Sequence, residues 1–231
     1  MQKLLLLGDE AIAQGAIDSG LSGIYAYPGT PSTEINEYVQ RSKEAKALNI
    51  QSSWSVNEKT AMEAALGMSY AGKRAMVCMK HVGLNVAADP FINSAITGTN
   101  GGLIVLSADD PSMHSSQNEQ DSRFYGKFAL IPVLEPSNQQ EAYDMVSYGF
   151  KISEELKTPV MLRITTRLAH SRSGVVRKEK IAQNAGSMPE NTRQFVLLPA
   201  IARKKYKALL LNQQVFELES ETAGFNKYIE G

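Results

Sequence analysis

Cysteine is almost absent from this sequence: Cys78 is the single thiol in 231 residues. One cysteine excludes an internal disulfide, and it also excludes the Cys/His spacings that hold zinc or an iron–sulfur cluster. Such a thiol content is compatible with a reducing compartment. We therefore expect a cytoplasmic protein with no metal ligands of its own.

Net charge and long apolar runs are missing as well. Lys and Arg number 24 and Asp and Glu number 24, so no basic excess exists to attract nucleic acid. The N-terminal apolar run contains only four leucines, which is too short for a signal sequence or a spanning helix. We expect no nucleic-acid partner and no membrane partner. A composition of 43% hydrophobic and 21% charged residues is ordinary for a globular chain.

Short apolar runs alternate with amphipathic stretches along most of the chain. Apolar runs of four to eight residues separated by helices predict βαβ crossovers and a parallel sheet. The fold class we expect is α/β, with a doubly wound, mostly parallel sheet and helices on both faces. The predicted strands are 3–7, 23–28, 50–56, 74–80, 102–108, 130–134 and 159–165, and the predicted helices are 9–20, 32–47, 57–71, 86–98, 116–128 and 138–156.

The alternation stops after about residue 170. The polar segment that follows lacks periodicity and indicates a surface connector, after which Pro199 begins another helical pattern. We expect an α/β domain over residues 1–175 and a linker with a helical extension over residues 176–231.

Loops that follow parallel strands are where ligands bind in such folds. The loop "YPGTPST" holds Pro28, Gly29 and Thr30 before a helix start, so it predicts either an anion-binding loop or a capped turn. The expected loop "KHVGLN" has Gly83, where a flat ligand can approach, between His81 and Asn85. Those two polar residues indicate either ligand contacts or structural hydrogen bonds.

Two further features follow the third and fifth predicted strands. The polar stretch 107–123 indicates either a substrate lid or a large surface excursion. Glu58 comes after "SSWSV", which we expect to be a buried strand, and opens an alanine-rich helix. The helix dipole alone accounts for an acid in a first turn, but an acid at the inner edge of a crevice also suits a bound partner.

Three segments carry a resemblance to a known family. They are "GDEAIAQGAIDSGLSGIYAYPGTPSTEI", "NEKTAMEAALGMSYAGKRAMVCMKHVGLNVAADP" and "SADDPSMHSSQNEQDSRFYGKFALIPVLEPSNQQEAYD". Together they resemble the N-terminal part of the alpha subunit of indolepyruvate ferredoxin oxidoreductases, which are thiamine-diphosphate-dependent 2-oxoacid:ferredoxin oxidoreductases. The resemblance runs from about residue 5 to 172 and continues through "FVLLPAIARKKYK".

The resemblance implies that residues 1–175 form a pyrimidine-binding domain for thiamine diphosphate. Glu58 then contacts N1′ of the aminopyrimidine ring, which promotes the imino form that deprotonates C2 of the thiazolium. Thr30 matches the threonine that contacts the carboxylate of the 2-oxoacid, and Arg123 is a candidate for pairing with substrate or stabilising the lid. The residues placed near the cofactor ring are Pro28, Gly29, His81, Gly83 and Asn85.

The resemblance also implies an activity and partners for a larger enzyme. An arylpyruvate such as indolepyruvate is decarboxylated, the acyl group passes to coenzyme A, and iron–sulfur clusters carry electrons to ferredoxin. The expected protein partners are a beta subunit and further copies of this chain in a homo-oligomer.

The sequence departs from the family in one respect. Family members continue into a diphosphate-binding domain with a Gly-Asp-Gly…Asn signature that holds Mg²⁺, and then into a cysteine-rich segment. In this chain the only Gly-Asp pair is Gly8-Asp9. We expect a piece of the enzyme, produced by truncation or by a split gene, and inactive in isolation. The alternative is a non-catalytic α/β assembly module that keeps the fold.

Overall fold

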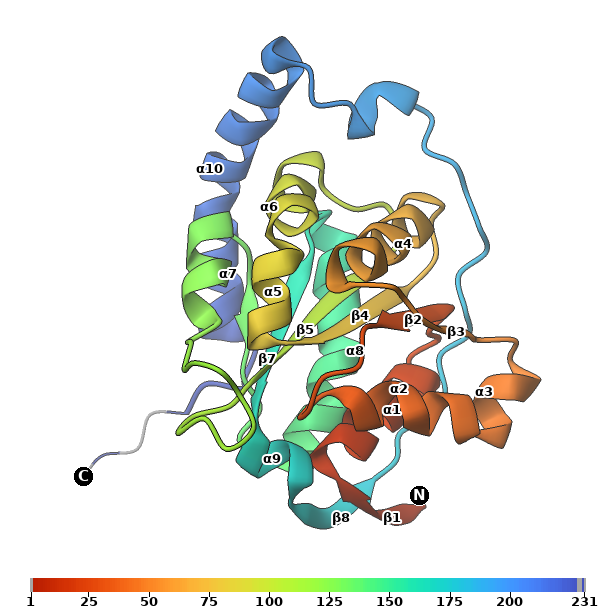
Figure 1. The fold of residues 1–231 in the computed structure, drawn as a ribbon. Helices are drawn as coiled ribbons and strands as arrows, with labels where there is room; N and C mark the ends of the chain where they lie inside the picture. The colour runs from red at the N-terminus through yellow and green to blue at the C-terminus, as the bar shows by residue number, and fades with distance from the viewer. Residues whose placement is uncertain (1, 228–229, 231) are drawn as a thin grey trace.

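A computed structural model describes residues 2–227 and 230, and its centre is a six-stranded parallel sheet (Figure 1). The strand order is β3-β2-β4-β5-β7-β6, and every neighbouring pair is parallel. The expected doubly wound α/β fold is therefore confirmed. The strands of this sheet are β2 (Gly23–Ala26), β3 (Gln51–Trp54), β4 (Ala75–Lys80), β5 (Leu103–Asp109), β6 (Val133–Leu134) and β7 (Val160–Thr165).

Helices cover both faces of the sheet, as Figure 1 shows. Helices α1, α2 and α8 pack on one face, and α4, α5 and α6 pack on the other. The described helices are α1 (Gly8–Asp18), α2 (Thr33–Arg41), α3 (Lys43–Ala47), α4 (Glu58–Tyr70), α5 (His81–Val86), α6 (Ala88–Thr97), α7 (Arg123–Ala129), α8 (Gln139–Leu156), α9 (Thr166–His170) and α10 (Pro199–Thr222), with a 3₁₀ turn at Thr192–Phe195.

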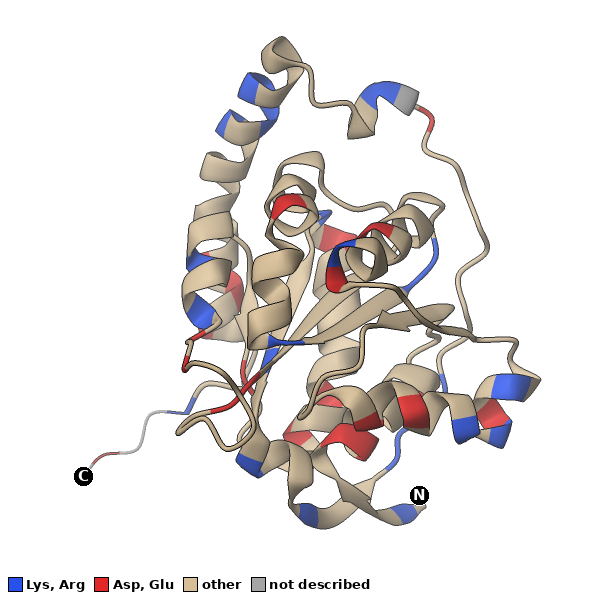
Figure 2. Ribbon diagram, in the orientation of Figure 1, with Lys and Arg blue, Asp and Glu red and all other residues tan. Residues whose placement is uncertain are grey.

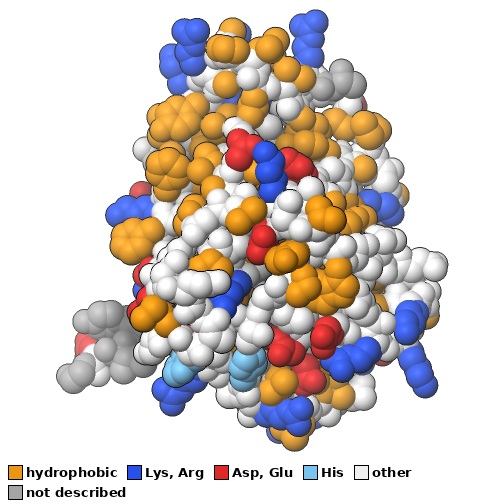
Figure 3. Space-filling view, in the orientation of Figure 1, with side chains coloured by type: hydrophobic (Ala, Val, Ile, Leu, Met, Phe, Trp, Pro, Cys, Tyr) orange, Lys and Arg blue, Asp and Glu red, His pale blue; other side chains and the backbone are white. Residues whose placement is uncertain are grey.

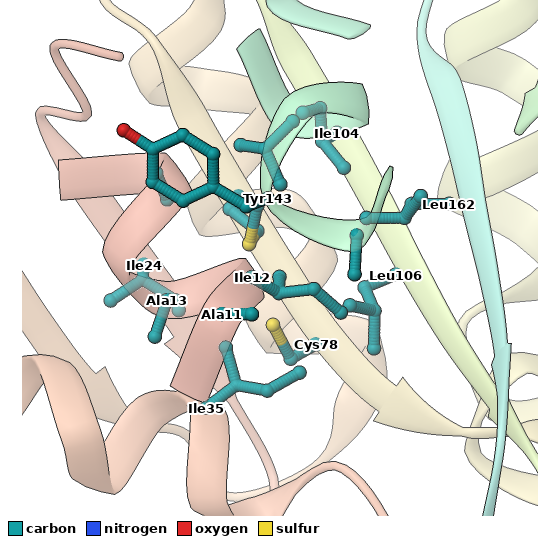
Figure 4. Packing of buried hydrophobic residues seen from close by; sticks show 14 of the residues in the cluster. Ala11, Ile12, Ala13, Ile24, Ile35, Cys78, Ile104, Leu106, Tyr143 and Leu162 are labelled. Atoms are coloured by element: carbon teal, nitrogen blue, oxygen red, sulfur yellow. The ribbon is translucent and has the colours of Figure 1, made fainter. Parts of the chain in front are cut away.

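The central strands are buried on both sides, and their side chains alternate between two cores. Met76 and Cys78 of β4 point toward α1 and α2, whereas Val77 points toward α4 and α6. Figure 4 shows Cys78 beside Ile12 in the first core. The thiol is fully buried, and this burial raises its pKa well above the usual value, so Cys78 acts as a small apolar core residue.

Strand β1 (Lys3–Leu7) departs from the sequence prediction, because it is not part of the parallel sheet. It pairs antiparallel with β8 (Arg172–Val176) to form a separate two-stranded ribbon. Only one side of the ribbon faces the core: Leu6 is 6% exposed and Leu5 is 69% exposed. The partner strand β8 lies in a segment that the sequence predicted to be irregular. The pairing joins two segments that are distant in the chain, and the local sequence of neither strand indicates its partner.

Two local expectations near the strand ends are also wrong. The strand "SSWSV" is not buried, because β3 is an edge strand and Val56 just beyond it is 81% exposed. The stretch "KHVGLN" is not a loop: the chain passes from β4 directly into α5. The helix expected at 86–98 corresponds to α6, and the unexpected α5 precedes it, with Ala87 capping the end of α5 and the start of α6.

The segment after β8 follows the surface of the α/β unit before α10 begins. Backbone bonds from Ile181 N to Asp18 O (2.7 Å) and from Ser187 N to Ala71 O (2.9 Å) attach it to that unit. Helix α10 packs on α6 through the buried Leu209. Among the described helices, none is long and apolar enough to cross a membrane.

Candidate functional site

The strand order reverses beside β2, and this reversal defines where a ligand crevice forms. The chain moves from β2 outward to β3, then returns past β2 to β4 and continues to β5. In open α/β sheets, ligands bind beyond the carboxyl ends of the strands at such a switch point. The segments that leave these strand ends are residues 27–32, residues 55–58 and helix α5.

Glu58 is the first residue of α4 and lies at the carboxyl ends of the strands. Asn57 caps the helix by accepting a hydrogen bond from Thr60 N at 2.9 Å, an interaction that typically contributes about 1 kcal/mol. The cap fixes the start of the helix and therefore the position of Glu58. Within the described part of the chain, the half-buried Glu58 carboxylate makes neither a hydrogen bond nor an ion pair. It is consequently available to a ligand.

Gly83 lies directly against the Glu58 side chain. A Cβ atom placed on Gly83 would lie 2.4 Å from Glu58 Oε1 and 2.7 Å from Glu58 Cγ. Any larger residue at this position of α5 would displace the carboxylate. The structure thus brings together two of the sequence-predicted residues that are 25 positions apart in the chain.

His81 and Asn85 lie on α5 but do not face Glu58. His81 is 1% exposed; its Nε2 lies 3.0 Å from Asn118 O and its Nδ1 lies 3.4 Å from Ala108 O. Asn85 Oδ1 accepts a hydrogen bond from Tyr125 OH at 2.5 Å. Both side chains make structural hydrogen bonds to neighbouring segments, one of the two interpretations that the sequence leaves open.

The loop after β2 is a compact turn. Gly29 N donates to Thr33 Oγ1 (2.9 Å), and Ser32 Oγ donates back to Gly29 O (2.8 Å). Pro28 and Thr30 are exposed, so the Thr30 side chain is open to solvent. A Cβ placed on Gly29 would be 3.3 Å from Lys80 Cβ, which places this turn against the end of β4. The turn that carries Thr30 therefore lies beside the carboxyl end of β4, from which α5 with Gly83 continues.

Lys80 is a site residue that the sequence reasoning missed. It is the last residue of β4, it is 9% exposed, and its Nζ donates to Ser115 O at 2.6 Å. Among the described residues, no carboxylate forms an ion pair with it. A lysine that ends an otherwise apolar buried strand is the signal that indicates it, because burying an unpaired ammonium group is costly.

Hydrogen bonds to two aspartates, Asp109 and Asp110, hold the polar stretch after β5 in place. Asp109 accepts from Ser122 N at 3.0 Å, and Asp110 accepts from Ser115 N at 2.8 Å and from Ser116 Oγ. Burial opposes ionisation of Asp110, but the hydrogen bonds outweigh it and hold the pKa of this carboxyl well below its usual range. We call residues 110–122 the cover. Its Ser115 carbonyl accepts the hydrogen bond from Lys80.

Arg123 makes no contact with Glu58 among the described residues. Its guanidinium donates to Asp121 (2.7 Å and 2.8 Å) and to Glu135 at 3.3 Å. The hydrogen bond and the charges of these two carboxylates raise its pKa. Arg123, at the start of α7, is thus paired with both carboxylates. Its pair with Asp121 connects α7 to the end of the cover.

Comparisons with known proteins identify the family of this chain. The family described as "Pyruvate flavodoxin/ferredoxin oxidoreductase, thiamine diP-bdg" matches residues 14–195. The indolepyruvate oxidoreductase subunit IorA of Pyrococcus horikoshii is 49% identical over 100% of this chain and 36% of that protein. The IorA subunit of Archaeoglobus fulgidus is 48% identical, again over 100% of this chain, and 38% of its own length is covered. The chain thus spans little more than a third of these curated relatives.

More distant relatives extend the same pattern. The 2-oxoglutarate synthase subunit KorA of Methanothermobacter thermautotrophicus is 27% identical over 78% of this chain and 49% of that protein. The solved 2-oxoglutarate:ferredoxin oxidoreductase of Magnetococcus marinus superposes with a TM-score of 0.73 at 18% identity, covering 99% of this chain and 47% of the other. That structural similarity establishes the fold. The extent of the family match establishes more: the chain belongs to the thiamine diphosphate-binding family of the pyruvate flavodoxin/ferredoxin oxidoreductases.

Proposed function

We propose that this chain supplies the pyrimidine-binding part of a thiamine diphosphate site in an indolepyruvate-type 2-oxoacid:ferredoxin oxidoreductase. The observation that carries the proposal is the position of Glu58. Its carboxylate is half-buried, has no partner in the described part of the chain, and lies over Gly83 at the switch point of the sheet.

The residues at this position fit an aminopyrimidine ring. A ring nitrogen needs one hydrogen-bonding acid, and Glu58 is a carboxylate without a competing bond among the described residues. A flat ring beside Glu58 needs the carboxylate to be held close to the backbone, and Gly83 allows this because it has no side chain to displace Glu58. The cofactor, when bound, would supply a carbon nucleophile, because loss of its acidic C2 proton leaves a carbon that attacks the carbonyl carbon of the 2-oxoacid.

The chain's own residues have three roles in this proposal. Glu58 holds a proton at N1′ of the ring, and Asn57 and Gly83 fix the direction of its carboxylate. Thr30 donates a hydrogen bond to the carboxylate of the 2-oxoacid from the turn after β2. Residues 110–122 form the cover in this proposal. Their Ser115 carbonyl accepts a hydrogen bond from Lys80, and the cover excludes water from the part of the site beside Lys80.

The test is exchange of the cofactor's C2 proton in the complete enzyme. Glu58→Gln retains the shape of the side chain and removes its acid, so we expect exchange to slow by about 10²–10⁴-fold. Glu63→Gln, on the same helix and exposed, is the matched control and leaves exchange unchanged. Equal exchange rates in the wild type and Glu58→Gln would contradict the proposal and favour a non-catalytic assembly module.

The diphosphate, Mg²⁺ and iron–sulfur clusters belong, in this proposal, to regions of the enzyme outside this chain. One charge-assisted hydrogen bond contributes about 1.5–3 kcal/mol, whereas micromolar binding needs about 8 kcal/mol. We therefore expect the chain alone to bind thiamine diphosphate weakly or not at all. The complete enzyme would convert arylpyruvates with coenzyme A and reduce ferredoxin.

Exposed apolar side chains support the proposal that this chain works in an assembly with a beta subunit and with other copies of itself. Phe124 and Phe128 of α7 are 69% and 70% exposed, and Leu211 of α10 is 76% exposed. Figure 3 shows apolar side chains gathered along α7 and α10. Exposed patches of this kind typically mark interfaces. Light scattering at high micromolar concentration tests the homo-oligomer, and strictly monomeric behaviour would count against it.

A further inference from the structure

A second cluster of ionisable side chains lies on the opposite face of the sheet from Glu58. It consists of Asp9 in the first turn of α1, Glu34 in the first turn of α2, and His170 at the end of α9. One donor atom from each residue lies within 4.8 Å of the others, and His170 Nε2 is 3.8 Å from Glu34 Oε1. The proposed function uses none of these three residues.

Asp9 is the unusual member of this cluster. It is 0% exposed, and neither oxygen of its carboxylate has a hydrogen-bond partner. Glu34 Oε2 is also buried without a partner. Among the described residues, buried side-chain oxygens without a partner are otherwise confined to Ser22, so the deficit is concentrated at this cluster.

Two facing carboxylates without donors require either a proton or a cation between them. Burial, followed by the charge of Glu34, raises the pKa of Asp9 well above its usual value. A shared proton satisfies the two acids alone, whereas a cation would also engage the His170 imidazole, whose Nε2 lies 3.8 Å from Glu34 Oε1. The imidazole beside the pair supplies a third donor of the kind that transition metals prefer.

The fold holds the three donors together through close packing of α1 on α9. Gly8 N donates to Ser171 O at 3.2 Å, and a Cβ on Gly8 would lie 2.2 Å from Leu168 O. Glycine at this position therefore allows the start of α1 to approach α9. Figure 2 shows the acidic residues of α1 and α2 gathered at this end of the molecule.

We propose that Asp9, Glu34 and His170 bind one divalent transition-metal ion, with Zn²⁺ as the best match. Zn²⁺ accepts both carboxylate oxygens and imidazole nitrogens, and three protein ligands leave its fourth position to water. The His170 and Glu34 side chains are 39% and 36% exposed, so an ion and its water can reach the buried Asp9 from solvent. Mg²⁺ and Ca²⁺ prefer oxygen ligands alone and bind this set less well.

A bound ion would join three helices that are distant in sequence. Glu34 follows Thr30 by four residues. The ion would therefore fix the start of α2 and, with it, the turn that carries Thr30. Its role is to hold this loop, and it takes no part in proton transfer at Glu58.

Calorimetric titration of the chelator-treated chain with ZnCl₂ tests the proposal. We expect one Zn²⁺ per chain and a higher melting temperature, with little response to MgCl₂. Substituting even a residue behind a ligand typically costs 10–100-fold in affinity, so Asp9→Asn and His170→Gln should each cost at least about tenfold.

The control is His114→Gln, which removes an exposed histidine outside the cluster and leaves binding unchanged. Asp9→Asn retains the side-chain shape and replaces one carboxylate oxygen with an amide nitrogen, so circular dichroism should show a folded chain. His170→Gln changes an exposed residue and serves as a second, independent variant. Absence of binding at millimolar Zn²⁺, or binding that both variants leave intact, would overturn the proposal. The C2–H exchange assay of Glu58 is not involved, so either proposal can fail alone.

Discussion

Glu58 lies directly against Gly83, so that a Cβ added to the glycine would be 2.4 Å from the carboxylate oxygen Oε1. Gly83→Ala must therefore displace the flexible end of Glu58. An alanine within a helix is favoured over glycine by about 0.8–1 kcal/mol. We expect the variant to fold as stably as the wild type or slightly more so, while C2–H exchange in the complete enzyme falls at least tenfold.

Urea denaturation and NMR exchange measure these two effects separately. The control is Gly67→Ala on α4, because a Cβ at Gly67 meets no atom within 4 Å. Gly67→Ala should gain similar helix stability without changing exchange. Normal exchange in Gly83→Ala would mean that the direction of the Glu58 carboxylate does not matter for the reaction.

Lys80 provides a second test, of how the substrate is held. Its buried ammonium group donates to Ser115 O but has no carboxylate partner among the described residues. If it faces the carboxylate of the 2-oxoacid, Lys80→Met removes a charge-assisted bond of about 1.5–3 kcal/mol. We expect KM for the 2-oxoacid to rise about 10–150-fold while kcat changes much less.

A structural role for Lys80 gives a different pattern. Loss of the bond to Ser115 O alone would lower the free energy of unfolding and leave KM unchanged. Lys59→Met is the control, because Lys59 is an exposed residue that pairs with Asp89 at 3.2 Å. That variant should alter neither quantity substantially.

Asp110 predicts how the cover responds to acid. Its pKa is lower in the folded chain than the value of about 3.9 in an unfolded chain, so its stabilising effect is fully present above pH 4. The effect is lost as the pH falls below 4 toward the folded pKa. At pH 7, we expect Asp110→Asn to lower the free energy of unfolding by about 1–3 kcal/mol, because a charged acceptor is lost.

Denaturant unfolding at pH 7 and at pH 3 checks this sign. The difference between wild type and Asp110→Asn should be smaller at pH 3, where the wild-type carboxyl is losing its advantage. A difference that stays constant between the two pH values would show that the charge of Asp110 does not stabilise the cover.

Local signals in the sequence predicted much of the fold. The residues from Ser137 to Glu141 have the spacing of a helix cap with either Ser137 or Asn138 as the cap, and in the structure Asn138 Oδ1 accepts from Glu141 N at 2.9 Å. The apolar run that contains Met76 and Val77 predicted a strand buried on both sides. In each example, the decisive interactions are between residues near one another in the chain or follow from burial alone.

Features that depend on distant pairings were not predictable in this way. The leucines of β1 indicate a strand, but only the partner 172–176 decides that it lies outside the main sheet. Helix α5 begins at His81 because the chain turns directly at the end of β4, and no local cap marks that start. The sequence singled out Glu58 and Gly83, which the fold brings into contact, and their role stays a prediction. The Asp9 cluster emerges only when separate elements are placed together.

The final prediction separates a buried ion pair from an exposed one. Arg163 is 7% exposed, and its Nε donates to the fully buried Asp109 at 2.8 Å. Removing one partner of a buried pair leaves an uncompensated charge and typically costs about 3–5 kcal/mol. We expect Arg163→Leu to lower the free energy of unfolding by about this amount and to loosen the cover that Asp109 holds through Ser122.

Arg123→Ala is the matched variant, because Arg123 forms the exposed counterpart of this pair with Asp121 at 2.7 Å. Exposed pairs contribute less than about 1 kcal/mol, so this variant should unfold at nearly the wild-type denaturant concentration. If Arg123 also pairs with substrate, KM for the 2-oxoacid rises in the complete enzyme without any change in stability. A loss of stability as large as that of Arg163→Leu would contradict the expected difference, because it would mean that the Arg123–Asp121 pair is shielded from solvent when the protein is folded.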